Sequence, residues 1–202
     1  MMSHSQGIFA ALRSQVRKRV LMPCLASLIV AAGFPAFAAA NGDNGNGLER
    51  GVKAAFLYKF LSFIEWPPAA FPAPDSPFVI GVTGADTVAA ELAQIAKGRT
   101  VSNRAVTVRR LDEKDPLAGI HLLFIGRGAA ARQPQLLAAA QQHPIVTVTE
   151  TDDALAHGSV INFKLSDGRV RFEVSLAAAE KNDLKLSSRM LAVASSVHGT
   201  RR

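Results

Sequence analysis

Glycine, small and acidic residues between positions 126 and 150 have a spacing that could bind a nucleotide. Gly126, Gly128 and Ala131 fit G-x-G-x-x-A between an expected strand and helix, and Glu150 ends the next expected strand. Such a turn can bring a helix N-terminus to a pyrophosphate while the acid binds a ribose. The motif opens in mid-chain, however, and Pro134 crowds the helix start. A tight strand-to-helix turn therefore explains the glycines better, and a Rossmann-like enzyme is the last of three hypotheses.

Other catalytic patterns are missing from the sequence. It contains neither a G-x-x-x-x-G-K-[ST] phosphate loop nor a G-x-S-x-G nucleophile turn. His121, His143, His157 and His198 are far apart and lack the spacing of metal ligands. His121 opens an apolar strand, where a hydrogen-bonded core histidine is the favoured interpretation. We therefore expect a binding or regulatory protein without cofactor or metal, and not an enzyme.

Aromatic residues of the first expected helix, residues 48–66, form the second candidate site. Three phenylalanines recur at helical spacing and suit a buried stripe, whereas Tyr58 and Trp66, the only Tyr and Trp, fall off it. Trp66 precedes two prolines that end the helix. It could line a pocket or a partner surface, where tryptophan is enriched, and simple packing explains it equally well.

Strands that alternate with helices are expected to position the residues of both candidate sites. Continuous apolar strands are expected near residues 78–82 and 120–125, each followed by a helix. An alternating strand is expected at 105–111 and another strand at 145–149. Residues 160–165 and 169–174 flank Asp167-Gly168, a strong hairpin signal. A short helix is expected at 152–157, and Ala-rich and final helices follow the hairpin. The pattern predicts an α/β fold: one three-layer domain with a mostly parallel sheet, helices on both faces and an antiparallel hairpin near the C-terminus.

Residues 1–40 have the three parts of a secretory signal peptide. Arg13, Arg17, Lys18 and Arg19 precede an apolar run over residues 20–40, and cleavage is expected near 38–40. An uncleaved inner-membrane anchor is the alternative, because the run is just long enough to span a bilayer. We expect an Asn/Gly-rich flexible tether at 41–47, the domain at 48–196, and a basic tail at 197–202.

The mature chain carries an ordinary surface charge. Four of the 23 basic residues lie in the leader, which leaves 19 basic against 16 acidic residues, a net charge of +3. That balance does not favour nucleic-acid binding, which needs basic residues clustered on one face. Cys24 is the only cysteine and lies in the leader, so the mature domain has no thiol chemistry.

Seven segments together resemble the YfiR-like family of periplasmic proteins. The first is V-K-A-A-F-L-Y-K-F, which continues to F-I-E-W-P, and the last is L-K-L-S-S. In order, the segments are residues 52–60, 63–67, 78–82, 120–125, 158–163, 167–174 and 184–188. The resemblance covers nearly all of residues 50–195.

The resemblance implies a periplasmic α/β protein that binds the periplasmic sensor domain of an inner-membrane diguanylate cyclase and represses it. It also implies an outer-membrane lipoprotein that relieves the block, and homodimers. A family pocket near the Trp-Pro motif and the hairpin arginine maps onto Glu65, Trp66 and Arg171, and Tyr58 joins them as a candidate contact. Repression of a cyclase is thus the first hypothesis, and a module that senses or binds a small solute is the second. The family's named member is under redox control through disulfides, and such control is excluded here if the leader is removed, because Cys24 is then lost.

Overall fold

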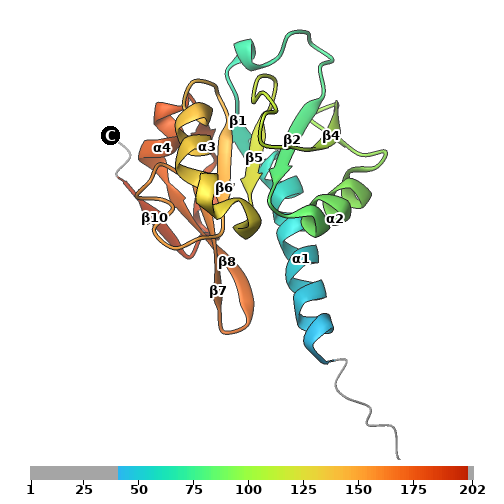
Figure 1. The fold of residues 1–202 in the computed structure, drawn as a ribbon. Helices are drawn as coiled ribbons and strands as arrows, with labels where there is room; N and C mark the ends of the chain where they lie inside the picture. The colour runs from blue at the N-terminus through green and yellow to red at the C-terminus, as the bar shows by residue number, and fades with distance from the viewer. Residues whose placement is uncertain (1–40, 200–202) are drawn as a thin grey trace, which may run out of the picture. The chain divides into compact units, whose positions relative to one another are not determined.

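Three largely buried strands form the centre of the computed structural model, which describes residues 41–199 (Figure 1). They are β2 (Phe78–Thr83), β5 (Leu122–Ile125) and β6 (Val146–Thr149), and every residue of β5 and β6 is buried. In β5, Leu122 and Phe124 belong to the core on one face of the sheet, and Leu123 and Ile125 to the core on the other. Burial on both faces explains the continuous apolar run of β5. Strand β6 is buried as fully but alternates, because Thr147 and Thr149 are buried polar residues.

The sheet has eight strands in the order β10-β8-β7-β6-β5-β2-β4-β3. The outer strands are β3 (Thr100–Val101), β4 (Arg104–Arg110), β7 (Ile161–Ser166), β8 (Arg169–Ser175) and β10 (Ser196–His198). Pairing is parallel except in the β7–β8 and β3–β4 hairpins. This confirms the expected fold class. Asp167 and Gly168 both have positive φ, 51° and 68°, as a two-residue hairpin turn of type I′ requires.

Helices cover both faces of the sheet. Helix α1 (Asn41–Phe60) packs beside α2 (Asp86–Ala96) on one face. The 3₁₀ turn η2 (Arg127–Arg132) and α3 (Gln133–Ala140) cover the other. Helices α4 (Leu176–Lys181) and α5 (Ser188–Leu191) follow the hairpin, each capped at its start by a serine side chain.

A second, two-stranded sheet joins the two ends of the domain. Strand β1 (Ile64–Glu65) pairs antiparallel with β9 (Lys185–Leu186), and the short 3₁₀ turn η1 (Pro68–Ala70) follows β1. The first helix was expected to run to residue 66, but it ends at Phe60 because residues 64–65 pair with β9. Pairing with a segment 120–122 positions away has no signature in the local sequence.

The N-terminal end of α1 also differs from expectation. Residues 41–47, predicted to be an irregular tether, belong to the helix. Extending an existing helix adds one hydrogen bond per residue, so weak helix formers can continue a helix that they would not nucleate. Gly45 and Asn46 are exposed. The expected signal peptide lies outside the described residues.

Two C-terminal expectations are wrong in detail. Residues 152–157 form turns rather than a helix, and Asp153 has a φ of 55°, which a right-handed helix cannot contain. Val197 and His198, expected in a basic tail, belong to β10. Within residues 41–199, no helix is long and apolar enough to cross a membrane.

Candidate functional site

The glycine-rich turn after β5 is closed by its own chain. The Gly126 amide donates to Thr83 O at 2.9 Å and the Gly128 amide to Gly84 O at 3.1 Å. A Cβ at Gly126 would lie 2.6 Å from Gly84 O, so a side chain there would collide with the backbone. Close packing of two loops therefore accounts for both glycines.

Glu150 occupies the position that an anionic ligand of this turn would need. Its Oε1 accepts the Arg127 amide at 2.9 Å, and its Oε2 pairs with Lys53 of α1, which also pairs with Glu49. The side chains of Lys53 and Glu150 are each only 9% exposed. Because a carboxylate of the chain already takes the turn's amide, this arrangement favours a structural turn over a pyrophosphate site.

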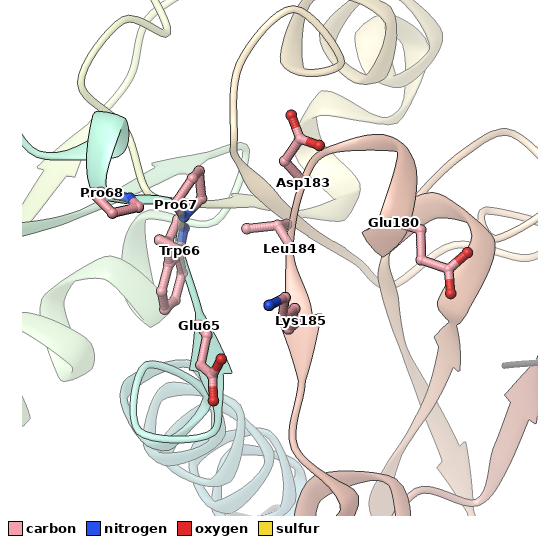
Figure 2. Close-up of a pocket in the computed structure, with 8 residues that line it drawn as sticks. All are labelled: Glu65, Trp66, Pro67, Pro68, Glu180, Asp183, Leu184 and Lys185. Carbon is pink, nitrogen blue, oxygen red and sulfur yellow. The ribbon is translucent and has the colours of Figure 1, made fainter. Parts of the chain in front are cut away.

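Glu65 and Trp66 line a cavity of about 630 Å³ between the β1 segment and the β9 segment. Figure 2 shows Glu65, Trp66 and the two prolines on one side and Asp183, Leu184 and Lys185 on the other. The full lining is Glu65, Trp66, Pro67, Pro68, Glu180, Asp183, Leu184 and Lys185. We call this cavity the Trp66 pocket. It offers an apolar wall and three carboxylates against one ammonium group, so it carries net negative charge.

His121, the residue immediately before β5, fixes the position of the Trp66 side chain. The indole Nε1 donates to His121 O at 3.2 Å, and the indole ring packs edge-on against Phe78 at 5.2 Å. His121 is 3% exposed. Its Nδ1 accepts the Val79 amide at 3.1 Å, and its Nε2 lies 3.2 Å from Ala70 O. The sequence-based interpretation of His121 as a hydrogen-bonded core residue is confirmed.

Electrostatics keep this imidazole neutral. Burial lowers the pKa of His121 below the ordinary 6.5; the hydrogen bond with Ala70 opposes this shift, and the Arg104 charge adds to it. The neutral form with the proton on Nε2 satisfies both contacts, because Nδ1 must accept and Nε2 must donate.

The β7–β8 hairpin carries Arg171 away from the Trp66 pocket. Strand β6 pairs with β7 only at Ile161 and Asn162, and β10 pairs with β8 only at residues 173–175. Residues 163–172 therefore extend past the main sheet as a two-stranded arm, which we call the hairpin arm (Figure 1). In Figure 1 it points toward the same side as the N-terminal end of α1.

The hairpin arm has two chemically different faces. Cross-strand pairs Phe163–Phe172 and Leu165–Val170 share one face, because side chains alternate along a strand. Phe172 packs on Phe56 and Phe60 of α1, with ring centroids 5.5 and 5.1 Å apart. Beyond that contact Leu165 is 57% exposed. The opposite face carries basic residues, namely Lys164, Arg169 and Arg171.

The four candidate site residues from the sequence do not form one site in the structure. Glu65 and Trp66 share a pocket, whereas Arg171 is exposed on the hairpin arm. Tyr58 is 8% exposed, and its hydroxyl donates to Thr100 O at 3.3 Å, so it is part of the core. Sequence reasoning missed Asp183 and Lys185, whose polar types gave no sign of a pocket. It also missed Leu165, although an apolar residue beside a hairpin turn is a detectable signal.

Comparisons with known proteins identify a family and a similar fold. A family model described as YfiR/HmsC-like matches residues 50–195. The crystal structure of a conserved domain protein from Vibrio cholerae O1 biovar El Tor str. N16961 is similar, with a TM-score of 0.51 and 11% identity. That match covers 73% of this chain and 60% of the other, and at this identity it supports the fold alone. No curated protein matches the chain.

Proposed function

The chain belongs to the YfiR/HmsC-like family, and from this membership we propose that it is a periplasmic repressor of an inner-membrane diguanylate cyclase. The resemblance to the YfiR-like family supports a regulatory role, and the cyclase as its target is part of this proposal. In this proposal the protein binds the cyclase's periplasmic sensor domain and lowers cyclic-di-GMP synthesis inside the cell. An outer-membrane lipoprotein relieves the block by sequestering the repressor.

The hairpin arm is the observation that carries the proposal. A two-stranded ribbon is at best marginally stable alone, and this one has an apolar face that α1 covers only at its base. Leu165, at 57% exposure, and Leu48 of α1, at 72%, are two of four large exposed apolar side chains among the described residues. Leu48 lies two helical turns, about 12 Å, before Phe56, and Leu165 lies two strand residues, about 7 Å, beyond Phe163. Both apolar side chains thus lie at one end of the domain.

The charges of the arm indicate the kind of partner. Lys164 and Arg171 are directly opposed across the hairpin, where like charges destabilise a sheet. Of these two, Lys164 has an acidic neighbour, Asp152 at 3.4 Å, and that carboxylate is itself 96% exposed. An acidic rim around an apolar patch on the sensor domain would complement this surface and steer the encounter.

Repression then requires only differential binding. If the arm binds the inactive conformation of the sensor domain better than the active one, the cyclase population shifts toward the inactive state. A shift from 1:99 to 99:1 needs about 5.5 kcal/mol of preference.

The test is intracellular cyclic-di-GMP in the native bacterium with and without the gene. We expect the level to rise on deletion and to fall again with an exported copy but not with a leaderless copy. An exported Leu165→Ser copy should fail to restore the low level. Val193→Ser is the matched control, because Val193 is also highly exposed, at 67%, but lies after α5. If both variants restore the low cyclic-di-GMP level, the arm is not part of the contact surface. If the level does not rise on deletion, the protein is not a repressor of a cyclase.

A small-molecule sensor is the second candidate function, and the Trp66 pocket favours it. Its volume of about 630 Å³ is that of a small-ligand site. Three carboxylates beside an indole suit a cationic ligand. An anionic ligand would have been expected only if Arg171 also lined the pocket. Mass spectrometry of the exported protein, denatured after native purification, tests for a retained ligand. A ligand retained by the unaltered protein and lost from Trp66→Ala would support this function, and identical spectra would count against it.

A further inference from the structure

The segment from Trp66 to Ser76 connects β1 of the two-stranded sheet to β2 of the main sheet. It contains six prolines or alanines in its first eight positions, the turn η1 and a second turn between Ala73 and Ser76, and it has no strand or α-helix of its own. Its first residues line the Trp66 pocket. Its attachment to the domain therefore depends on side chains from other elements.

His121 supplies one attachment and Arg104 of β4 supplies the other. Arg104 Nη1 donates to Ala73 O at 3.2 Å and Ser76 O at 2.7 Å. His121 bonds to Ala70 O through Nε2, and its backbone oxygen accepts the Trp66 indole. These four contacts are distributed along the whole segment, from its tryptophan to its last serine.

Phe71 connects the two attachments. Its ring stacks on the His121 imidazole, with centroids 4.5 Å apart, and the Arg104 guanidinium carbon lies 3.9 Å from the same centroid. Phe71 thus contacts both a buried imidazole and a permanent cation. Release of Phe71 would loosen both attachments together.

The hydrogen bonds of His121 tolerate one protonation state only. The imidazole Nδ1 accepts the Val79 amide, so a proton added to Nδ1 would face an N–H donor. None of the hydrogen bonds to the ring comes from a carboxylate, and Arg104 is the charged group whose field reaches it. Phe78 and Trp66, which also pack on the ring, carry no charge. A positive imidazole would therefore lose a hydrogen bond, lie in an apolar cage, and repel Arg104.

We infer that His121 is an acid-sensitive lock on the segment from Trp66 to Ser76, and that its protonation releases this segment and reshapes the Trp66 pocket. The regulatory consequence rests on the proposed sensing function of that pocket, while the lock itself is a property of the protein alone. In a periplasmic protein the signal would be acidification outside the cytoplasm.

The direction of the pH effect follows from linkage. Burial lowers the pKa of His121 in the closed state, whereas an opened segment exposes the ring and restores a pKa near 6.5. The open state thus binds more protons, and its population rises as the pH falls below about 6.5. Above that pH both states are neutral and the lock stays closed.

Trp66 is the only tryptophan of the chain, so its fluorescence reports on this segment. We expect its emission to shift to the red as the exported protein is titrated from about pH 8 to about pH 5, a range that histidine titrates in and most carboxylates do not. The midpoint should lie below 6.5. His121→Asn keeps an acceptor for the Val79 amide but cannot take up a proton in this range, so its emission should stay constant. His143→Asn, which alters an exposed histidine, should behave like the unaltered protein.

A second measurement keeps the test independent of how well the variant folds. The ring proton resonances of His121 in the unaltered protein should titrate with the same midpoint as the Trp66 emission. The lock is refuted if His121 titrates while Trp66 emission stays constant, if the midpoint is 6.5 or higher, or if folded His121→Asn retains the shift. Because no partner is present, these outcomes are separate from the cyclic-di-GMP result with Leu165→Ser.

Discussion

Replacement of Lys53 by methionine tests the idea that the glycine-rich turn is held by a buried ion pair. Methionine keeps the length of the side chain and removes the charge that pairs with Glu150 and Glu49. Removal of one partner from a buried pair costs about 3–5 kcal/mol, because the other charge is left uncompensated. We expect about 3 kcal/mol, the lower end of that range, because Glu150 keeps the Arg127 amide and the side chain of Glu49 is 27% exposed.

The free energy of unfolding of the exported protein can be measured by urea titration with linear extrapolation. For a domain of this size a loss of about 3 kcal/mol corresponds to a melting temperature lower by about 6–12 °C. The double variant Lys53→Met/Glu150→Gln removes both charges while a side-chain oxygen still accepts the Arg127 amide. It should recover most of the loss, since a neutral pair leaves no buried charge. A loss below about 1 kcal/mol for Lys53→Met would refute the reasoning, because the pair would then behave like an exposed one.

Two further stability predictions follow from backbone and ring contacts. Gly84→Ala should cost more than about 3 kcal/mol, because its φ is +68° and the new Cβ would lie 2.2 Å from Ala129 N. Gly98→Ala has the same φ but open space, so its cost should be only about 1–2 kcal/mol; equal losses in urea titrations would contradict the steric argument. Phe172→Ala should cost about 3–5 kcal/mol because the arm loses its contact with α1. Leu165→Ala should change stability by less than about 0.5 kcal/mol, and a large loss there would mean that Leu165 is not a free contact residue.

The central elements could be predicted because their evidence is local. Continuous apolar runs mark β2 and β5, and Asp167-Gly168 marks the hairpin turn. A strand buried on both faces can be apolar at every position, so the pattern of β2 and β5 is visible without knowledge of their neighbours. The buried role of His121 was predicted on the same ground.

Elements that depend on distant pairing could not be predicted. Residues 64–65 follow a helical pattern, yet they form β1 because residues 185–186 supply hydrogen-bond partners. Strand β10 exists only as a parallel neighbour of β8. The turns at 152–157 contain polar residues that also occur at helix starts, and the positive φ of Asp153 became visible only in the fold.

The candidate sites show the same division. Residue types alone indicated that Trp66 could contact a ligand or partner and that Gly126 and Gly128 make a tight turn. The family resemblance added Glu65. Tertiary structure decided that Tyr58 is buried, that Arg171 lies on a projecting arm, and that Glu150 meets Lys53 across 97 residues of chain. The physical reason is that helical and strand periodicity are properties of neighbouring residues. The charge and hydrogen-bond environment of a side chain depends instead on whichever segments the folded backbone brings within a few ångströms.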